Sequence, residues 1–582
     1  MRHHQTTLLS RDSWPRLCVA LRETLKKGYD VTDLHADLMA GIIVGIVAIP
    51  LGMALAIASG VAPQYGLYTV IIAGSTVALL GGSRFQVTGP TAAFVVILVP
   101  ISQKFGLGGL LVAGLMAGIM LMLLGIARMG RLIQFIPAPV TTGFTAGIAV
   151  VIATLQIKDF LGLHIHEMPE RYVGKVVALV HAVDTASWSA FFIGAITLTI
   201  LLGWPYVNKR IPAPLIALIT ASGIAALLSY LIPTFTVATI GSTFTYMIDG
   251  ITGYGIPSTP PRWMLPWHMP GPSGSLSWFS FDMLETLLPH ACAIAMLGAI
   301  ESLLSAVVAD GMTQTKHDPD AELIALGIGN IVCPFFGGIA ATGAIARTAT
   351  NIRFGARSPL AAVIHALFTC VVIVFLAPYV AYLPMASLAA LLLLVAYTMS
   401  DVRHFVNILK IAPKGDVIVM LTCFLLTVVF DMVLGVAVGV VLAALVFMQR
   451  MAASTTSRML TEEHHPLIKK PLSHNVVVYE IAGPLFFGAA EQAIEALESI
   501  TDSVTTVIFV MNSVPIMDIT GFIAFKSAIK HLTSRKQRVI LVGMHQQPAT
   551  LLASSGLLES SPLIEVYVHL DDALATITSP RS

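Results

Sequence analysis

Long apolar runs separated by short polar stretches fill the first three quarters of the chain. A helix that crosses the hydrocarbon core of a bilayer needs about 20 apolar residues. Fourteen runs are recognised, and two of them are short and interrupted by glycine or proline. The runs lie at 38–58, 66–81, 88–102, 107–127, 138–156, 187–202, 213–231, 283–309, 322–336, 343–352, 358–377, 380–398, 416–431 and 433–449. The pattern predicts an α-helical polytopic membrane domain with 14 transmembrane segments over residues 38–450.

The pattern changes after about residue 450. Residues 451–473 are mostly polar and predict a linker. Over residues 474–582, stretches typical of strands alternate with stretches of helical spacing, which predicts a small α/β domain. The strands are expected at 474–481, 504–511, 539–543 and 564–568, and the helices at 491–499, 522–532 and 548–555.

Residues 1–37 are polar and lack the short apolar core of a signal peptide, so they predict a cytosolic N-terminal segment. Lysine and arginine concentrate in cytosolic loops. With the N-terminus inside, only the loop 157–186 breaks this bias, and an even number of spans returns the chain to the cytosol. Both termini are therefore predicted to be cytosolic. The loops assigned to the cytosol hold Arg84, Arg128, Arg131, Lys209, Arg210, Lys316, Arg353, Arg357, Arg403, Lys410 and Lys414.

The composition narrows the function classes. Charged residues make up 11% of the chain, against roughly 25% in soluble proteins, which excludes a soluble enzyme. A net charge of +1 gives no case for nucleic acid. The five cysteines lie far apart and predict neither a disulfide framework nor a metal site. No nucleotide-binding loop or catalytic triad is present, so no cofactor is expected.

The two interrupted runs suggest a binding site. The third run opens with Thr88-Gly89-Pro90, the tenth opens at the pair Thr342-Gly343, and each run is third in its half of seven. Broken helices at corresponding places in two halves mark transporter sites. If their N-termini meet, the free amides and positive dipole ends make an anion site. The alternative is that both sequences are kinks within packed helices.

Two charged residues stand inside apolar runs, where charge is costly and usually functional. Glu301 lies in the eighth run with Ser305 four residues later on the same face, and Arg347 lies in the tenth. Glu301 could take up a proton during transport. It could instead form a structural ion pair with Arg347, and the two roles are compatible. His365, in the eleventh run, is expected to be a satisfied core histidine.

Several motifs resemble one known family. The run Asp37-Leu38-Met39-Ala40-Gly41, then Ile49-Pro50, the stretch from Gly60 to Tyr68 and Ile300-Glu301-Ser302 are similar to the sulfate permease family, whose animal relatives form solute carrier family 26. The C-terminal domain resembles a STAS module. A closer resemblance, to bacterial C4-dicarboxylate transporters of this family, rests on motifs at 81–85, 156–163, 313–317 and 484–487.

The resemblance implies an inverted repeat of seven plus seven segments. Segments 1–4 and 8–11 would form a core that moves as an elevator against a gate of segments 5–7 and 12–14, and relatives are homodimers. By motif matching, the anion would lie between the third and tenth half-helices. Thr91, Ala92, Gly343, Ala344 and Arg347 would surround it, and Glu301 and Ser305 would occupy the place of a coupling ion.

Two positions depart from the family patterns. Many sulfate transporters have Pro-Gln where this chain has Pro50-Leu51, so one polar contact to sulfate is missing. In the STAS loop, Ile519 stands between Asp518 and Thr520 at the place of the serine that anti-sigma-factor antagonists phosphorylate. A phosphate-independent regulatory loop is therefore expected, suited to docking a cytosolic protein.

Together these observations predict a secondary transporter of a bacterial inner membrane that imports C4-dicarboxylates with protons. The expected partners are a small anion, membrane lipid, a second copy of the chain and a cytosolic protein on the STAS domain. One alternative is bicarbonate or sulfate transport coupled to sodium or protons. The other is an anion channel or scaffold in which the STAS domain recruits a partner.

Overall fold

The computed structural model describes residues 17–133, 137–165, 168–169, 171–208, 211–248, 251–271, 280–430, 432–453, 455–460, 475–486 and 503–578. The chain divides into two compact units, Met1–Val440 and Val441–Ser582.

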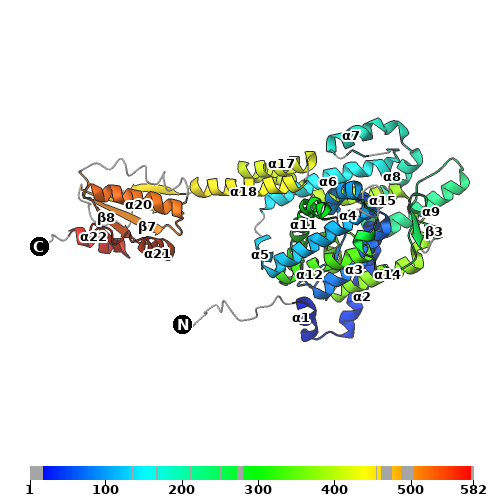
Figure 1. Cartoon of the computed structure of the whole chain (residues 1–582), viewed down its shortest axis with the longest axis horizontal. Coiled ribbons are helices and arrows are strands. Elements are labelled where there is room, and N and C mark those ends of the chain that lie inside the picture. The colour runs from blue at the N-terminus through cyan, green and yellow to red at the C-terminus, as the bar shows by residue number, and fades with distance from the viewer. Residues whose placement is uncertain are drawn as a thin grey trace. The chain divides into compact units, whose positions relative to one another are not determined.

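The first unit is a bundle of long apolar helices (Figure 1). Among the described residues, 11 helices are long and apolar enough to cross a membrane. In the first half the helices are α2 (Val31–Ala58), α3 (Pro63–Leu80), α4 (Ala92–Ile126), α6 (Ala138–Leu161), α8 (Trp188–Val207) and α9 (Ala213–Leu231). In the second half they are α11 (Phe281–Thr313), α12 (Pro319–Val332), α14 (Leu360–Val380), α15 (Met385–Ser400), whose apolar stretch continues to Ile411, and α18 (Met432–Ala453). Two shorter helices, α13 (Ile345–Arg353) and α17 (Lys414–Val429), lie between them. The predicted polytopic helical class is confirmed.

The predicted third and fourth segments form one helix with a break, α4. Gly106 interrupts it with φ 68° and ψ −171°. A side chain at Gly106 would meet the backbone of Pro270 and Gly271, and a left-handed φ is costly for any residue with a Cβ. Glycine therefore allows the turn between the two segments without a separate loop.

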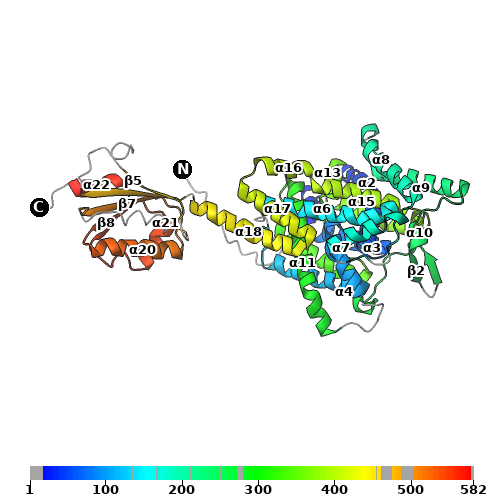
Figure 2. The ribbon, with the colours of Figure 1, turned by 90° about the horizontal axis from the view of Figure 1, so that it is seen from above.

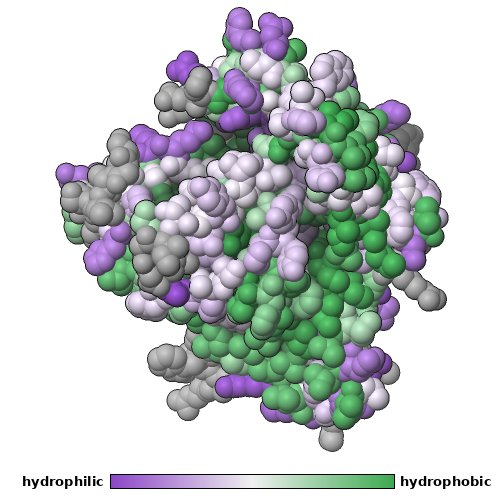
Figure 3. Space-filling view, turned by 90° about the vertical axis from the view of Figure 1, so that its right-hand side faces the viewer, coloured by the Kyte–Doolittle hydropathy of each residue, from purple (hydrophilic) through white to green (hydrophobic). Residues whose placement is uncertain are grey.

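The helices pack as the two groups expected for a core and a gate. On one side α4 packs against α12 and α11, and α2 packs against α14 and α3. On the other side α6 packs against α15 and α17, and α8 packs against α15 and α9. Figure 2 shows α6 and α15 side by side. One outer face of the molecule carries a broad hydrophobic area with hydrophilic side chains at its borders (Figure 3), as expected for a surface in contact with lipid.

The start of the first span is tied to the loop before α14. The carboxylate of Asp37, which is fully buried, accepts hydrogen bonds from the backbone amides of Arg357 and Ser358, at 2.6 and 3.1 Å. It also accepts from the Ser358 hydroxyl at 2.5 Å and from the Tyr29 hydroxyl at 2.9 Å. Burial and the Asp37 carboxylate raise the pKa of Tyr29 to about 12, so the phenol remains a donor at neutral pH.

Several short elements of the first unit have no counterpart in the predicted spans. They are the helices α1 (Val19–Lys27), α7 (Tyr172–His181) and α16 (Val402–Ile411), and the hairpin of β2 (Thr245–Ile248) and β3 (Ile251–Tyr254). The helices α7 and α16 are only 10 residues each, too short to give a spanning signal.

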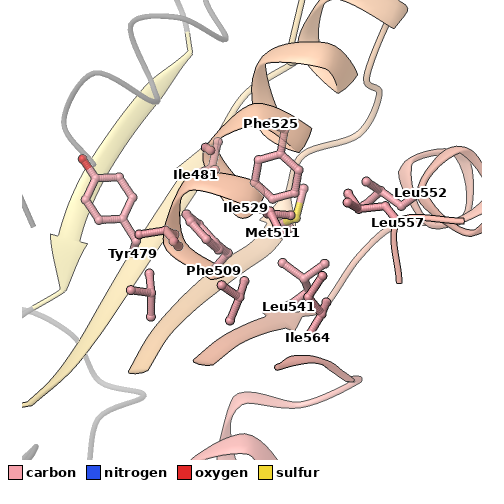
Figure 4. Packing of buried hydrophobic residues seen from close by; sticks show 14 of the residues in the cluster. Tyr479, Ile481, Phe509, Met511, Phe525, Ile529, Leu541, Leu552, Leu557 and Ile564 are labelled. Atoms are coloured by element: carbon pink, nitrogen blue, oxygen red, sulfur yellow. The ribbon is translucent and has the colours of Figure 1, made fainter. Parts of the chain in front are cut away.

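The second unit contains a five-stranded sheet in the order β5-β6-β7-β8-β9. Strands β6 (Val476–Ala482), β7 (Thr506–Ser513), β8 (Arg538–Val542) and β9 (Ile564–Tyr567) run parallel, and β5 (Thr456–Leu460) pairs antiparallel with β6. Helices cover both faces: α20 (Ile519–Ser534) and α21 (Gln546–Ser554) on one, and α22 (Leu570–Thr578) on the other. Figure 4 shows the hydrophobic core between the sheet and the face covered by α20 and α21. There the rings of Phe509 and Phe525 meet edge to face, with their centroids 5.3 Å apart.

The sheet begins earlier than expected. Strand β5 lies within residues 451–473, where a linker was predicted, so that part of the prediction is wrong. The error has a physical reason, because β5 is an edge strand with mostly exposed residues and therefore carries a weak apolar signal. The helix expected at 491–499 and most of the remaining linker lie outside the described residues.

Candidate functional site

The two interrupted segments meet in the middle of the first unit. Thr88 and Gly89 form β1, Thr342 and Gly343 form β4, and the two strands pair antiparallel with Thr88 opposite Gly343. The Ala344 amide extends the ladder by donating to the carbonyl of Val87 at 2.9 Å. Helix α4 starts three residues after β1 and α13 starts two residues after β4, so the positive ends of both helices lie close to this ladder.

Neither helix is capped by its own N-cap side chain. Thr91 and Ala344 hold the N-cap positions of α4 and α13, and neither makes a side-chain cap. Threonine normally caps the first turn of a helix, but the Thr91 hydroxyl donates to Oε2 of Glu301 at 2.8 Å instead. The first-turn amides of both helices therefore lack the usual side-chain acceptor, which favours an external anion there.

Helix α11 holds both broken segments through three polar side chains. Glu301 accepts from Thr91 at the start of α4. Ser302 accepts a 2.6 Å hydrogen bond from the side-chain amide of Gln86, just before β1. Ser305 donates to the Thr348 hydroxyl on α13 at 3.1 Å.

These contacts connect the predicted coupling residues to both broken segments. Glu301 contacts the start of α4 and Ser305 contacts α13, and their shared role in holding a coupling ion stays a prediction. Gln86 and Thr348 were not singled out from the sequence, and Ser302 was noted only as part of the Ile300-Glu301-Ser302 motif. Their signal was present, since all three are polar residues within apolar stretches, but their pairing depends on the tertiary structure.

Arg347 reaches across from α13 to the segment before α4. Its side chain is 2% exposed, and Nη2 donates to the carbonyl of Pro90. Nε and Nη1 have no hydrogen-bond partner among the described residues. A cation buried with free donors needs a compensating group, because unpaired buried charge is costly.

The hypothesis of a direct ion pair between Arg347 and Glu301 is not supported. In the described part of the chain no hydrogen bond or ion pair joins the two side chains, although they interact electrostatically through space. Glu301 is bound to Thr91, and Arg347 to Pro90. The two charges therefore flank the start of α4, and an anion near Arg347 would not have to break an existing pair.

The small residues at the β1–β4 ladder that were predicted to surround the anion are buried. A Cβ at Gly343 would collide with the side-chain nitrogen of Gln86 and lie 3.0 Å from Cα of Ser302, so a side chain there would displace Gln86. Ala92 and Ala344 are 6% and 9% exposed. The exposed residues at the start of α13 are Ile345 and Ala346, which are therefore better placed than Gly343 to border a bound anion.

His365 differs from the satisfied core histidine that was expected. It is fully buried on α14, and neither ring nitrogen has a hydrogen-bond partner among the described residues.

The predicted regulatory loop lies at the start of α20 in the second unit. Asp518 caps the helix by accepting from the Gly521 amide at 2.6 Å, and Thr520 is exposed in the first turn. Ile519 is 64% exposed. A depression of about 660 Å³ lies beside this loop, lined by residues that include Pro515 and Gln547, and the Gln547 side chain binds the backbone of Met517 through both its oxygen and its nitrogen.

Comparison with known proteins covers both units. Residues 34–422 match the sulfate permease family, and residues 468–573 match the STAS domain. A relative from Bacillus subtilis (strain 168), "Putative sulfate transporter YvdB", is 41% identical over 547 residues, which cover 94% of this chain and 98% of the relative. The "Bicarbonate transporter BicA" of Picosynechococcus sp. is 27% identical, with 94% and 98% covered.

A solved structure shares the fold. The structure of SLC26A9 superimposes with a TM-score of 0.83 at 19% identity and covers 97% of this chain and 92% of that chain. These relatives do not reproduce the resemblance to C4-dicarboxylate transporters, because their names refer to sulfate and bicarbonate.

Proposed function

The chain belongs to the sulfate permease family of anion transporters, and we propose that it is a secondary transporter of a small oxyanion of the sulfate or bicarbonate class. The observation that carries this proposal is Arg347. It is buried at the junction of two uncapped helix N-termini and keeps Nε and Nη1 without a partner in the described structure. A compact oxyanion supplies acceptors for these donors and negative charge for both helix dipoles.

The charge around the site favours a small anion. Arg347 and the two helix N-termini attract negative charge. Glu301, which is bound to Thr91, repels an anion and so limits how closely an anion can approach Thr91. A compact anion can bind Arg347 and the amides of α13 while remaining on the far side of Thr91 from Glu301. The relatives named for sulfate and bicarbonate support the same class.

Proton-coupled import of C4-dicarboxylates is the second candidate. It rests on the resemblance of the sequence motifs and on Leu51, which stands where many sulfate transporters carry glutamine. In the structure Leu51 packs with apolar residues of other helices, including Leu201, Ala217 and Leu391. An apolar residue at this place removes one polar contact to sulfate.

Coupling is proposed to act through α11. A cation near Glu301, either a proton on the carboxylate or sodium beside it, would lower the repulsion between Glu301 and the anion. Since Glu301 binds Thr91 and Ser305 binds Thr348, such a change would alter the hydrogen bonds that join α11 to both half-helices. In this proposal the core helices, with the site, move against the gate helices as an elevator.

The membrane, the topology and the oligomeric state of the transporter are proposed from the family resemblance and from the distribution of lysine and arginine in the loops. The protein would lie in a bacterial inner membrane as a homodimer, with both termini and the STAS domain in the cytosol. The exposed loop at Asp518 and Thr520 would dock a cytosolic protein and regulate transport. If the chain instead forms an anion channel, uptake would follow the electrochemical gradient without accumulation coupled to another ion.

Transport into proteoliposomes tests the proposal. Labelled sulfate, bicarbonate and succinate would be supplied separately under imposed pH, sodium or potassium-diffusion gradients. Accumulation of sulfate or bicarbonate above the external concentration, driven by a proton or sodium gradient, supports a coupled oxyanion transporter. Accumulation of succinate alone supports the second candidate, and equilibration without coupled accumulation supports a channel.

A further inference from the structure

Helix α16 has an unusual division of its surface. It lies between the apolar helices α15 and α17, and the left-handed backbone of Asp401 (φ 36°, ψ 56°) separates it from α15 (Figure 2). A helix set off by a turn between two apolar helices of a membrane domain is expected at the membrane boundary. None of its residues is buried. Its apolar residues Val402, Val406 and Leu409 are 51%, 37% and 39% exposed, which is unusual for a helix that packs only against protein.

Eight of the ten positions on α16 form three parallel stripes, and His404 and Ile411, both exposed, lie on the remaining side. With about 3.6 residues per turn, Phe405 and Ile408 share one side, and both are half-buried. Phe405 contacts Phe424 of α17 with ring centroids 5.6 Å apart, so this side faces the protein. Val402, Val406 and Leu409 form the next stripe and are exposed.

The third stripe is polar and basic. Arg403, Asn407 and Lys410 follow the exposed apolar stripe around the helix, and all three are exposed. Lys414, also exposed, begins α17 beyond the end of α16. A helix with protein on one side, an exposed apolar stripe next to it and a basic stripe beyond has the features of a helix lying in a membrane interface.

We propose that α16 is an anionic-lipid binding helix, with Val402, Val406 and Leu409 in the acyl region and Arg403 and Lys410 on lipid phosphates. Long basic side chains can bury their stems beside apolar residues while their charged ends reach the headgroups. The occupant is lipid because connectivity places α16 at the membrane boundary and its charge complements an anionic headgroup. This inference is independent of which anion the protein transports.

Helix α7 provides an internal comparison. It also lies between two spans, α6 and α8, and exposes Val173, Val177 and Val180 by 63%, 48% and 64%. Its one lysine, Lys175, is buried and not part of that exposed stripe. We expect α7 to contact lipid without preferring anionic headgroups, whereas α16 selects them.

Lipid binding to the full-length protein tests the proposal. Purified wild type, Arg403→Gln/Lys410→Gln and the control Lys530→Gln would be titrated with phosphatidylglycerol or phosphatidylcholine in neutral detergent, and bound lipid counted by native mass spectrometry. Lys530 is exposed on α20, in the other unit. Each basic residue removed from α16 should weaken phosphatidylglycerol binding roughly fivefold, and the double variant roughly 30-fold.

The same experiment can overturn the proposal. It fails if the double variant binds phosphatidylglycerol like wild type, if Lys530→Gln loses as much, or if wild type binds phosphatidylcholine equally well. Competition by water-soluble glycerol phosphate at the same concentration would indicate a phosphate site without lipid. Protection of α16 by a second copy of the chain in neutral lipid would also contradict a lipid-facing helix.

A matched pair of variants tests the apolar stripe separately. Val406→Asp should lower the unfolding temperature in bilayers, because it places a charge in the acyl region, whereas the neighbouring Asn407→Asp should not. Equal effects of the two variants would mean that Val406 does not face lipid.

Discussion

The hydroxyl of Thr91 donates a 2.8 Å hydrogen bond to the Glu301 carboxylate, so the residue in the N-cap position of one half-helix serves a neighbouring helix instead of its own. Two consequences follow. The first turn of α4 keeps its amides free of a side-chain acceptor. A change in the charge of Glu301 acts directly at the start of that helix.

Replacing Glu301 by glutamine should remove the dependence of transport on the coupling gradient. Glutamine retains an acceptor for Thr91 and nearly the same size, but it does not titrate. We expect Glu301→Gln to exchange anion across the membrane while failing to accumulate it under a pH or sodium gradient, measured in proteoliposomes. Asp310→Asn, nine residues later on α11, serves as a control carboxylate. Gradient-driven accumulation that remains at the wild-type level would exclude Glu301 as the coupling group.

Arg347→Met should separate binding from stability. Methionine fills similar space without a charge, so removing an under-paired buried cation should leave the unfolding temperature equal or higher. Loss of charged hydrogen bonds to the anion should weaken binding roughly 10- to 100-fold. Isothermal titration and thermal unfolding measure both effects, with the exposed Arg353→Met as control. Unchanged anion affinity in Arg347→Met would place the site elsewhere.

Gly343→Ala should destabilise the first unit by about 1–3 kcal/mol. The added methyl group would collide with the Gln86 side chain and approach Ser302 in a closed part of the core. Gly223→Ala is the matched control, since a Cβ at that position meets nothing within 4 Å, and alanine there should stabilise α9 by about 0.4–1 kcal/mol. Chemical denaturation compares the two. A stable Gly343→Ala variant that loses only anion binding would mean that the space beside Gly343 is occupied by the anion.

The Asp37 cluster should be a major source of stability at the start of the first span. Asp37→Ala leaves the amides of Arg357 and Ser358 and the Tyr29 hydroxyl without their acceptor, which should cost about 3 kcal/mol. Tyr29→Phe removes one of these bonds and should cost about 1 kcal/mol.

The pH dependence of the Tyr29 contribution has a definite sign. Because the folded pKa of Tyr29 is raised to about 12, its hydrogen bond is fully present below the ordinary tyrosine pKa and is lost as pH rises through about 12. The difference in unfolding free energy between wild type and Tyr29→Phe should therefore be constant between about pH 6 and 9. A difference that disappears within that range would show that Tyr29 does not act through its protonated hydroxyl.

Removing the STAS domain should leave anion preference unchanged and alter only rate or expression. The cut should precede Thr456, because β5 belongs to the sheet and a cut after residue 460 would leave an unpaired strand attached to the membrane unit. The order in which competing anions inhibit uptake is the measurement, and Thr520→Glu in the full chain is the conservative test of the loop. A truncated protein that is folded in the membrane but prefers a different class of anion would contradict a purely regulatory role.

The sequence alone determined the membrane class, the helical nature and order of the apolar segments, and the α/β character of the C-terminal domain. These properties follow from composition and periodicity, which depend on how many apolar residues each segment must bury and on which side. The sequence also indicated the two interrupted segments, because a threonine-glycine pair inside an apolar run is a local feature.

Only the tertiary structure decided how the polar residues pair. Glu301 binds Thr91 rather than Arg347, and Ser302 and Ser305 divide between the two broken segments, because these contacts join residues 43 to 216 positions apart. The close approach of the Gln86 side chain to Gly343 is also a tertiary contact, which no local pattern could indicate. Strand β5 and helix α16 depend in the same way on neighbours, since an edge strand and an interfacial helix bury too little apolar surface to be marked in the sequence.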